Sequence, residues 1–171
     1  LVNCALAQKG KDGQELGIVS YSTESIWCAK FVMSCVGKIG LSTSVMPTNY
    51  YAKTTLLTSS TKSQQYTATA WGLGVYVFDH LGGRLFKSDL SGNITKEVIY
   101  SSKAETLDDC SEISTSEKPR AGDLVILCGG NGDHVGIMVD STHFVSGSVW
   151  NGTKVFVYYD NTPLYNTVSN S

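Results

Sequence analysis

The sequence has few charged residues and few prolines, and it has no apolar stretch long enough to cross a membrane. Lys, Arg, Asp and Glu make up 16% of the 171 residues, and the formal net charge of −2 leaves no basic field that would attract nucleic acid. Three prolines and an apolar fraction of 42% argue against disorder. The chain therefore predicts one globular domain over residues 1–171, with no membrane span and no nucleic-acid partner.

The N-terminus also lacks the basic region and apolar segment that make up a signal peptide. Residue 1 is a leucine, so we expect a mature form or an excised domain. The composition favours Ser, Thr, Gly, Asn and Tyr over Lys and Glu. This bias favours an extracellular or cell-surface setting.

The five cysteines are an odd number, so at least one thiol is free or joined to another chain. They are Cys4, Cys28, Cys35, Cys110 and Cys128. No two are spaced as CxxC, and no histidine lies at a zinc-ligand spacing from them, which argues against structural zinc. In an oxidising compartment, Cys4 with Cys110 or Cys110 with Cys128 are candidate disulfides, and the sequence does not choose between them.

One cysteine lies in the first turn of a predicted amphipathic helix. Apolar or small residues recur at helical spacing from 28 to 39, which predicts a helix over about 25–39 that Gly40 ends. Ser25 is a suitable N-cap. Because the positive end of the helix dipole favours a thiolate, Cys28 is a candidate nucleophile. The alternative is that Cys28 is one more buried residue of the apolar face.

The first two thirds of the chain contain weaker signals. Residues 2–9 predict a short helix that Gly10 ends. A segment rich in Ser and Thr, residues 42–69, predicts a long surface excursion that is partly helical. Strands are expected around 74–78 and 97–100, and an acidic loop or short helix over 103–117.

After Pro119 the pattern becomes that of β-strands separated by turns. The strands are predicted at 123–128, 134–140, 143–149 and 153–159. An Asn-Gly pair at 151–152 is a strong hairpin signal between the last two. Helices followed by an antiparallel sheet predict an α+β fold.

A histidine opens one of these strands. In the strand 134–140, alternation turns the valines and the isoleucine toward the core, so His134 lies on the opposite face. Its place beside a glycine-rich turn predicts a histidine accessible from a cleft, the alternative being an ordinary surface histidine. His80 and His143 are rival bases; His80 lies in a predicted turn, and His143 lies beside a predicted hairpin turn.

Three motifs, taken together and in order, favour the catalytic alternative. They are WCAKFV from Trp27, PRAGDLV from Pro119 and DHVGIMV from Asp133. In this order they resemble the papain-like peptidoglycan hydrolases, the CHAP (cysteine, histidine-dependent amidohydrolase/peptidase) family and its NlpC-type relatives. The resemblance covers roughly residues 1–45 and 117–160. Residues 46–116 match nothing in that family and are predicted to be an insertion in a single papain-like domain.

The resemblance implies a papain-like α+β fold, with N-terminal helices packed on a C-terminal antiparallel sheet. It implies cleavage of amide bonds in the peptide part of bacterial peptidoglycan, by an amidase or endopeptidase. Cys28 would attack the carbonyl to form a thioester, and His134 would take the thiol proton and later protonate the leaving amine. The backbone N–H of Cys28 would contribute to an oxyanion hole. The mechanism requires no metal and no organic cofactor.

The residue that orients the imidazole departs from the family pattern. In the family the next strand supplies His, Glu, Asn or Gln, whereas this chain reads FVSGS over 144–148. Ser146 is the best match, because register places it on the face of His134. The alternatives are Ser148, Asp140, Asn151 and a backbone carbonyl. A neutral acceptor is sufficient, because this group positions the base and does not itself move the proton.

The substrate side is less specific. Trp27, Tyr21 and Trp150 are candidate groove residues, and each is equally compatible with a place in the core or at the rim. Trp27 and Ala29 stand where NlpC-type enzymes carry aspartate and serine, which favours the CHAP side of the resemblance.

Two other functions remain open. One is a weak or inactive module that binds cell wall or glycan, and the other is a cysteine protease or toxin that acts on proteins. The expected setting is secreted, directed to the cell wall or periplasm, whether by a phage, a secretion system or a resident autolysin. The insertion at 46–116 would form a groove wall or dock a partner such as an inhibitor or immunity protein.

Overall fold

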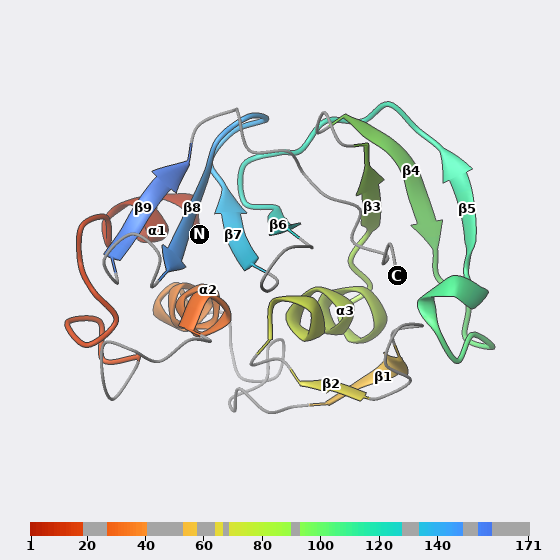
Figure 1. The fold of residues 1–171 in the computed structure, drawn as a ribbon, viewed down its shortest axis with the longest axis horizontal. Helices are drawn as coiled ribbons and strands as arrows, with labels where there is room; N and C mark the ends of the chain where they lie inside the picture. The colour runs from red at the N-terminus through yellow and green to blue at the C-terminus, as the bar shows by residue number, and fades with distance from the viewer. Residues whose placement is uncertain are drawn as a thin grey trace. The chain divides into compact units, whose positions relative to one another are not determined.

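The computed structural model describes residues 1–18, 27–40, 53–57, 64–66, 69–89, 93–127, 134–148 and 154–158. The helices in these ranges are α1 (Val2–Leu6), α2 (Trp27–Lys38), α3 (Ala70–His80) and the short 3-10 helix η1 (Leu107–Asp109). The strands are β1 (Lys53–Leu57), β2 (Gln64–Tyr66), β3 (Leu85–Ser88), β4 (Ile94–Ile99), β5 (Ser111–Ser114), β6 (Leu124–Leu127), β7 (His134–Met138), β8 (Phe144–Ser148) and β9 (Lys154–Tyr158). They form sheets ordered β1-β2, β3-β4-β5 and β6-β7-β8-β9 (Figure 1). The α+β class is confirmed.

The chain forms two compact units. Unit 1 comprises Leu1–Tyr50, Pro119–Val125 and Val135–Thr162, and unit 2 comprises Tyr51–Lys118, Ile126–His134 and Pro163–Ser171. Most of the segment predicted as an insertion, 46–116, therefore belongs to unit 2. That the whole chain is one papain-like domain remains a prediction.

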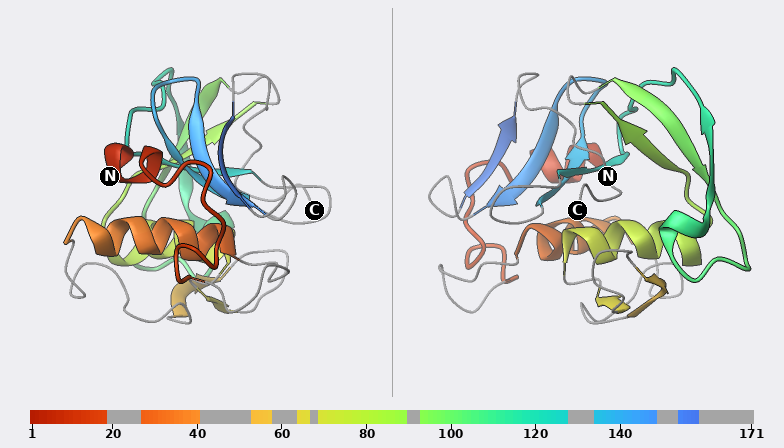
Figure 2. Two further views of the ribbon diagram at one scale, coloured as in Figure 1. Left: turned by 90° about the vertical axis from the view of Figure 1, so that its left-hand side faces the viewer. Right: turned by 45° about the vertical axis from the view of Figure 1, so that its right-hand side comes forward.

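In unit 1, α2 is the helix predicted over about 25–39. Its buried side chains recur at helical spacing. Gly40 ends it at a φ of 72°, a left-handed conformation that glycine adopts without strain. Ser25, the predicted cap, lies outside the described residues. α1 packs against α2, and α2 packs against β8 (Figures 1 and 2).

The four C-terminal strands are confirmed, each at most two residues shorter than predicted. β7, β8 and β9 pair antiparallel in sequence order, with Ile137 opposite Val145. All five residues of β7 are buried, so the expectation of one core face and one accessible face was wrong. A strand buried on both faces accepts small and apolar residues at every position.

A glycine lets α2 approach β8 closely. A Cβ atom on Gly147 would lie 2.7 Å from Cε3 and 2.9 Å from Cη2 of Trp27. The Trp27 side chain is only 1% exposed, so its ring has no free space to move into. The first residue of α2 is thus fixed against the sheet by close packing.

We expect Gly147→Ala to destabilise the protein by about 2 kcal/mol, because the added methyl group overpacks the Trp27 contact. Urea denaturation measures the change. Gly37→Ala is the matched control, since Gly37 is an exposed residue of α2 and a Cβ there meets nothing within 4 Å. The control should be neutral or slightly stabilising. Equal effects of the two substitutions would contradict the packing argument.

In unit 2, α3 corrects the strand predicted around 74–78. Thr69 caps the helix, and its side-chain oxygen accepts a hydrogen bond from the Gly72 N–H at 2.9 Å. Most of the helix is buried, so its apolar residues lie on all sides and show no helical stripe. A Cβ on Gly74 would collide with the Ile126 side chain, so glycine permits that contact.

The segment 42–69 was expected to be partly helical, but its described residues include two antiparallel strands, β1 and β2. The predicted helical patch, 49–53, lies outside the described residues except at Lys53. The Leu56 N–H of β1 donates to Oδ2 of Asp79 at 3.0 Å, which links this hairpin to α3. The two strands are only five and three residues long, too short for an alternating apolar pattern to indicate them in the sequence.

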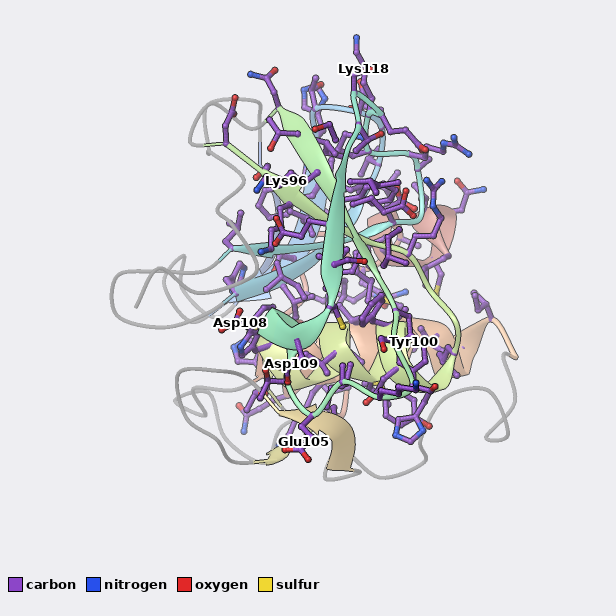
Figure 3. All side chains as sticks on the ribbon, turned by 90° about the vertical axis from the view of Figure 1, so that its right-hand side faces the viewer. Lys96, Tyr100, Glu105, Asp108, Asp109 and Lys118 are labelled. Carbon is purple, nitrogen blue, oxygen red and sulfur yellow. The ribbon has the colours of Figure 1, made fainter. Side chains whose placement is uncertain are left out.

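Ion pairs connect residues in and next to the sheet β3-β4-β5. Arg84 forms a bidentate pair with Glu97 and a further pair with Glu117. Figure 3 shows Lys96 within β4, Tyr100 just after the end of that strand, and Asp108 and Asp109 on η1. The strand predicted at 97–100 is confirmed in part by β4. Within 103–117 the short helix η1 is present, and the strand β5 was missed.

Candidate functional site

Cys28 is the second residue of α2 and is 8% exposed. The N–H groups of a helix's first turn have no acceptor within the helix, and this end of the helix stabilises an anion. Its neighbours Trp27 and Ala29 are buried. Cys28 therefore occupies the predicted place in the helix, with a small accessible surface.

His134 is the first residue of β7, as predicted, but it is only 7% exposed. The sequence suggested an open cleft position, and the burial of β7 corrects that expectation. Burial lowers the pKa of His134 to about 4, because the charged imidazolium loses its hydration. At neutral pH the ring is uncharged and is in the form that accepts a proton.

Ser146, in β8, is fully buried. Its Oγ donates a hydrogen bond of 2.7 Å to the carbonyl oxygen of Val135, the residue that follows His134 in β7. A hydroxyl has one proton and two lone pairs. With the proton directed to Val135, Ser146 offers an imidazole N–H only an acceptor.

Asp140 is the acceptor of a turn. Its Oδ1 accepts from the backbone N–H of Thr142 at 2.8 Å and of His143 at 2.9 Å, and it also lies 2.9 Å from Nδ1 of His143. The Thr142 backbone N–H and the His143 side chain are the main causes that lower the Asp140 pKa to about 2. This carboxylate organises the β7–β8 connection together with the rival base His143. The side chains of Ser148 and Asn151 lie outside the described residues.

The other rival base, His80, is the last residue of α3 and not a turn residue as expected. Its ring stacks on Tyr76 with 4.7 Å between centroids. Its Nε2 lies 3.6 Å from Oδ1 of Asp79. Both contacts are with side chains of α3, so they hold the His80 ring against its own helix in unit 2.

Of the three predicted groove residues, only Trp27 is described. It is 1% exposed and packs on Gly147, which favours the core alternative for this side chain. Tyr21 and Trp150 lie outside the residues that the structure describes.

No pattern in the sequence predicts that Cys4 and Cys35 are neighbours. Their side chains form a hydrogen bond, and neither Cys4 nor Cys35 is in a disulfide in the structure. Burial, followed by the proximity of Cys4, raises the pKa of Cys35 to about 12. A thiol so difficult to ionise is a poor nucleophile.

Within the described residues, no group of three or more His, Cys, Asp or Glu side chains is arranged to hold a metal ion. No helix in that same part of the chain has the length and apolar character needed to cross a bilayer.

No protein-family model, curated protein or solved structure matches this chain significantly. What the site does must therefore follow from its own side chains and the elements that carry them.

Proposed function

We propose that this protein is a papain-like cysteine hydrolase that cleaves amide bonds in the peptide part of bacterial peptidoglycan, with Cys28 as nucleophile and His134 as base. One observation carries the proposal. The helix with Cys28 in its first turn packs against β8, and β8 pairs with β7, the strand that His134 begins. A cysteine in the first turn of a helix and an imidazole that is uncharged at neutral pH are the nucleophile and the base that acyl transfer by a cysteine hydrolase uses.

In the proposed reaction, His134 takes the proton from the Cys28 thiol as the sulfur attacks the amide carbonyl. The backbone N–H of Cys28, in the first turn of α2, donates to the developing oxyanion. The tetrahedral intermediate collapses to a thioester when His134 protonates the leaving amine. Water then hydrolyses the thioester, with His134 again as base.

Ser146 is the proposed positioning residue. Because its hydroxyl proton is bonded to the Val135 carbonyl, its lone pairs are oriented by a buried, fixed group. An N–H of the His134 imidazole donating to this oxygen would fix the ring with its other nitrogen directed to the nucleophile.

The substrate class sets the place of action. Peptidoglycan lies in the bacterial wall or periplasm, so we propose that the protein is secreted toward it. A chain with this activity requires restraint by an inhibitor or immunity protein wherever it meets the wall of its own producer.

The test is to incubate the purified protein with isolated peptidoglycan and to identify soluble products by mass spectrometry. We expect fragments that have gained one water molecule at a single type of amide bond, and the bond itself tells an amidase from an endopeptidase. Intact peptidoglycan that merely co-sediments with the protein would establish the wall-binding alternative. Cleavage of a protein substrate such as casein, with peptidoglycan untouched, would establish the protease alternative.

A further inference from the structure

Two cysteines outside the proposed catalytic pair lie together in unit 1. Cys4 belongs to α1 and Cys35 to α2, the two helices pack against each other, and the thiols are hydrogen-bonded. Cys35 is 1% exposed, whereas Cys4 is partly exposed. Cysteines on two packed helices, with side chains that hydrogen-bond to each other, are candidates for the geometry of a disulfide, whose S–S bond is about 2.05 Å long.

We propose that Cys4 and Cys35 form a disulfide in an oxidising compartment, which ties α1 to the helix that carries Cys28, while Cys28 stays in the thiol form. This pairing replaces the Cys4–Cys110 bond suggested by sequence. It leaves Cys110 and Cys128 as the remaining cysteines.

The helix itself excludes the competing pair. Cys28 and Cys35 are seven residues apart in α2, and at about 1.5 Å of rise per residue their Cα atoms are about 10 Å apart along the axis. Disulfides require Cα atoms within about 7 Å. Cys35 therefore cannot pair with Cys28 while α2 is folded, and its partner is the thiol it already contacts.

The bond forms by thiol–disulfide exchange, and the oxidant is the disulfide of a thiol oxidoreductase or of oxidised glutathione. Cys4 is the more exposed thiol, so it loses its proton to solvent and attacks the oxidant, which releases one thiol. Cys35 then gives up its proton and attacks the Cys4 sulfur of the mixed disulfide, which releases the second thiol. Two protein S–H bonds are replaced by one S–S bond, and the oxidant is reduced to two thiols.

The consequence is a covalent loop that includes the whole segment leading into α2. Such a cross-link restricts the unfolded chain more than the folded one. We expect the oxidised protein to melt about 10 °C above the reduced protein. Because burial raises the pKa of Cys35 to about 12, closure of the bond should accelerate as pH rises.

The experiment equilibrates the full chain in oxidised or reduced glutathione, alkylates free thiols in denaturant, and maps the peptides by mass spectrometry. In the oxidised sample we expect one linked peptide containing Cys4 and Cys35, lighter by two hydrogen atoms than its reduced parts, with Cys28 alkylated. Alkylation of both Cys4 and Cys35 in the oxidised sample would overturn the proposal. So would a peptide that joins either of them to another cysteine.

Two variants sharpen the assignment. Cys110→Ser removes a buried cysteine of unit 2, so the linked peptide and the melting difference should persist. Cys4→Ser should lose both. If Cys4→Ser fails to fold, the peptide map of the unmodified chain still decides the pairing. Loss of the Cys4–Cys35 peptide in Cys110→Ser would count against the proposal.

Discussion

Cys28→Ser lowers the rate of amide hydrolysis by about a thousandfold or more, while the protein stays folded. The reason lies in the base. With a pKa of about 4, the buried imidazole of His134 is weakly basic. An ordinary thiol has a pKa of about 8.5, far below that of an alcohol, so this base can activate sulfur but not a serine hydroxyl. Serine differs from cysteine by one atom, so the packing at α2 is retained.

The measurement is the turbidity of a peptidoglycan suspension, with circular dichroism to verify folding. Cys110→Ser is the matched control, because Cys110 is 7% exposed and Cys28 is 8% exposed, so the two substitutions are made at similarly buried positions. The control should clear the suspension at the unmodified rate. Undiminished clearing by a folded Cys28→Ser protein would remove Cys28 from the mechanism.

The parts of the fold that were predicted correctly are those in which local chemistry and tertiary packing agree. α2 shows a helical stripe and ends at a glycine of positive φ, and the strands from β6 to β9 are bounded by turn residues. α3 was missed because burial on all sides removes the stripe, and an apolar run with β-branched residues then reads as a strand.

The site shows the same limit. That Cys28 begins a helix and His134 begins a strand follows from sequence alone. The burial of Cys28 and His134 does not follow from the sequence, because it depends on what covers each element. The hydrogen bond from Ser146 to the Val135 carbonyl could not be predicted either. The contact of Cys4 with Cys35 joins two helices whose packing no local pattern encodes.

His134→Gln should lower the rate by about a thousandfold, because glutamine cannot take up the thiol proton. The unmodified protein should keep its activity as the pH falls through 6.5, and lose it only near pH 4, since burial holds the His134 pKa at about 4. His143→Gln is the control, because the His143 ring interacts with Asp140 in the β7–β8 turn and has no role in the proposed mechanism. A rate that falls near pH 6.5, or that falls equally in both variants, would contradict the assignment of His134.

The same shift predicts a change in stability, and it separates burial of His134 from catalysis. In the unfolded chain the histidine pKa is about 6.5, so as the pH falls the unfolded state binds the proton before the folded state does. The free energy of unfolding should therefore fall by about 3 kcal/mol between pH 6.5 and pH 4 on account of this residue. Urea denaturation at pH 7 and pH 4.5 measures the loss, which His134→Gln should reduce and His143→Gln should leave in place. A histidine that had stayed accessible would have a pKa near its ordinary value and would contribute no such slope, so this measurement tests the burial even if the substrate proves to be different.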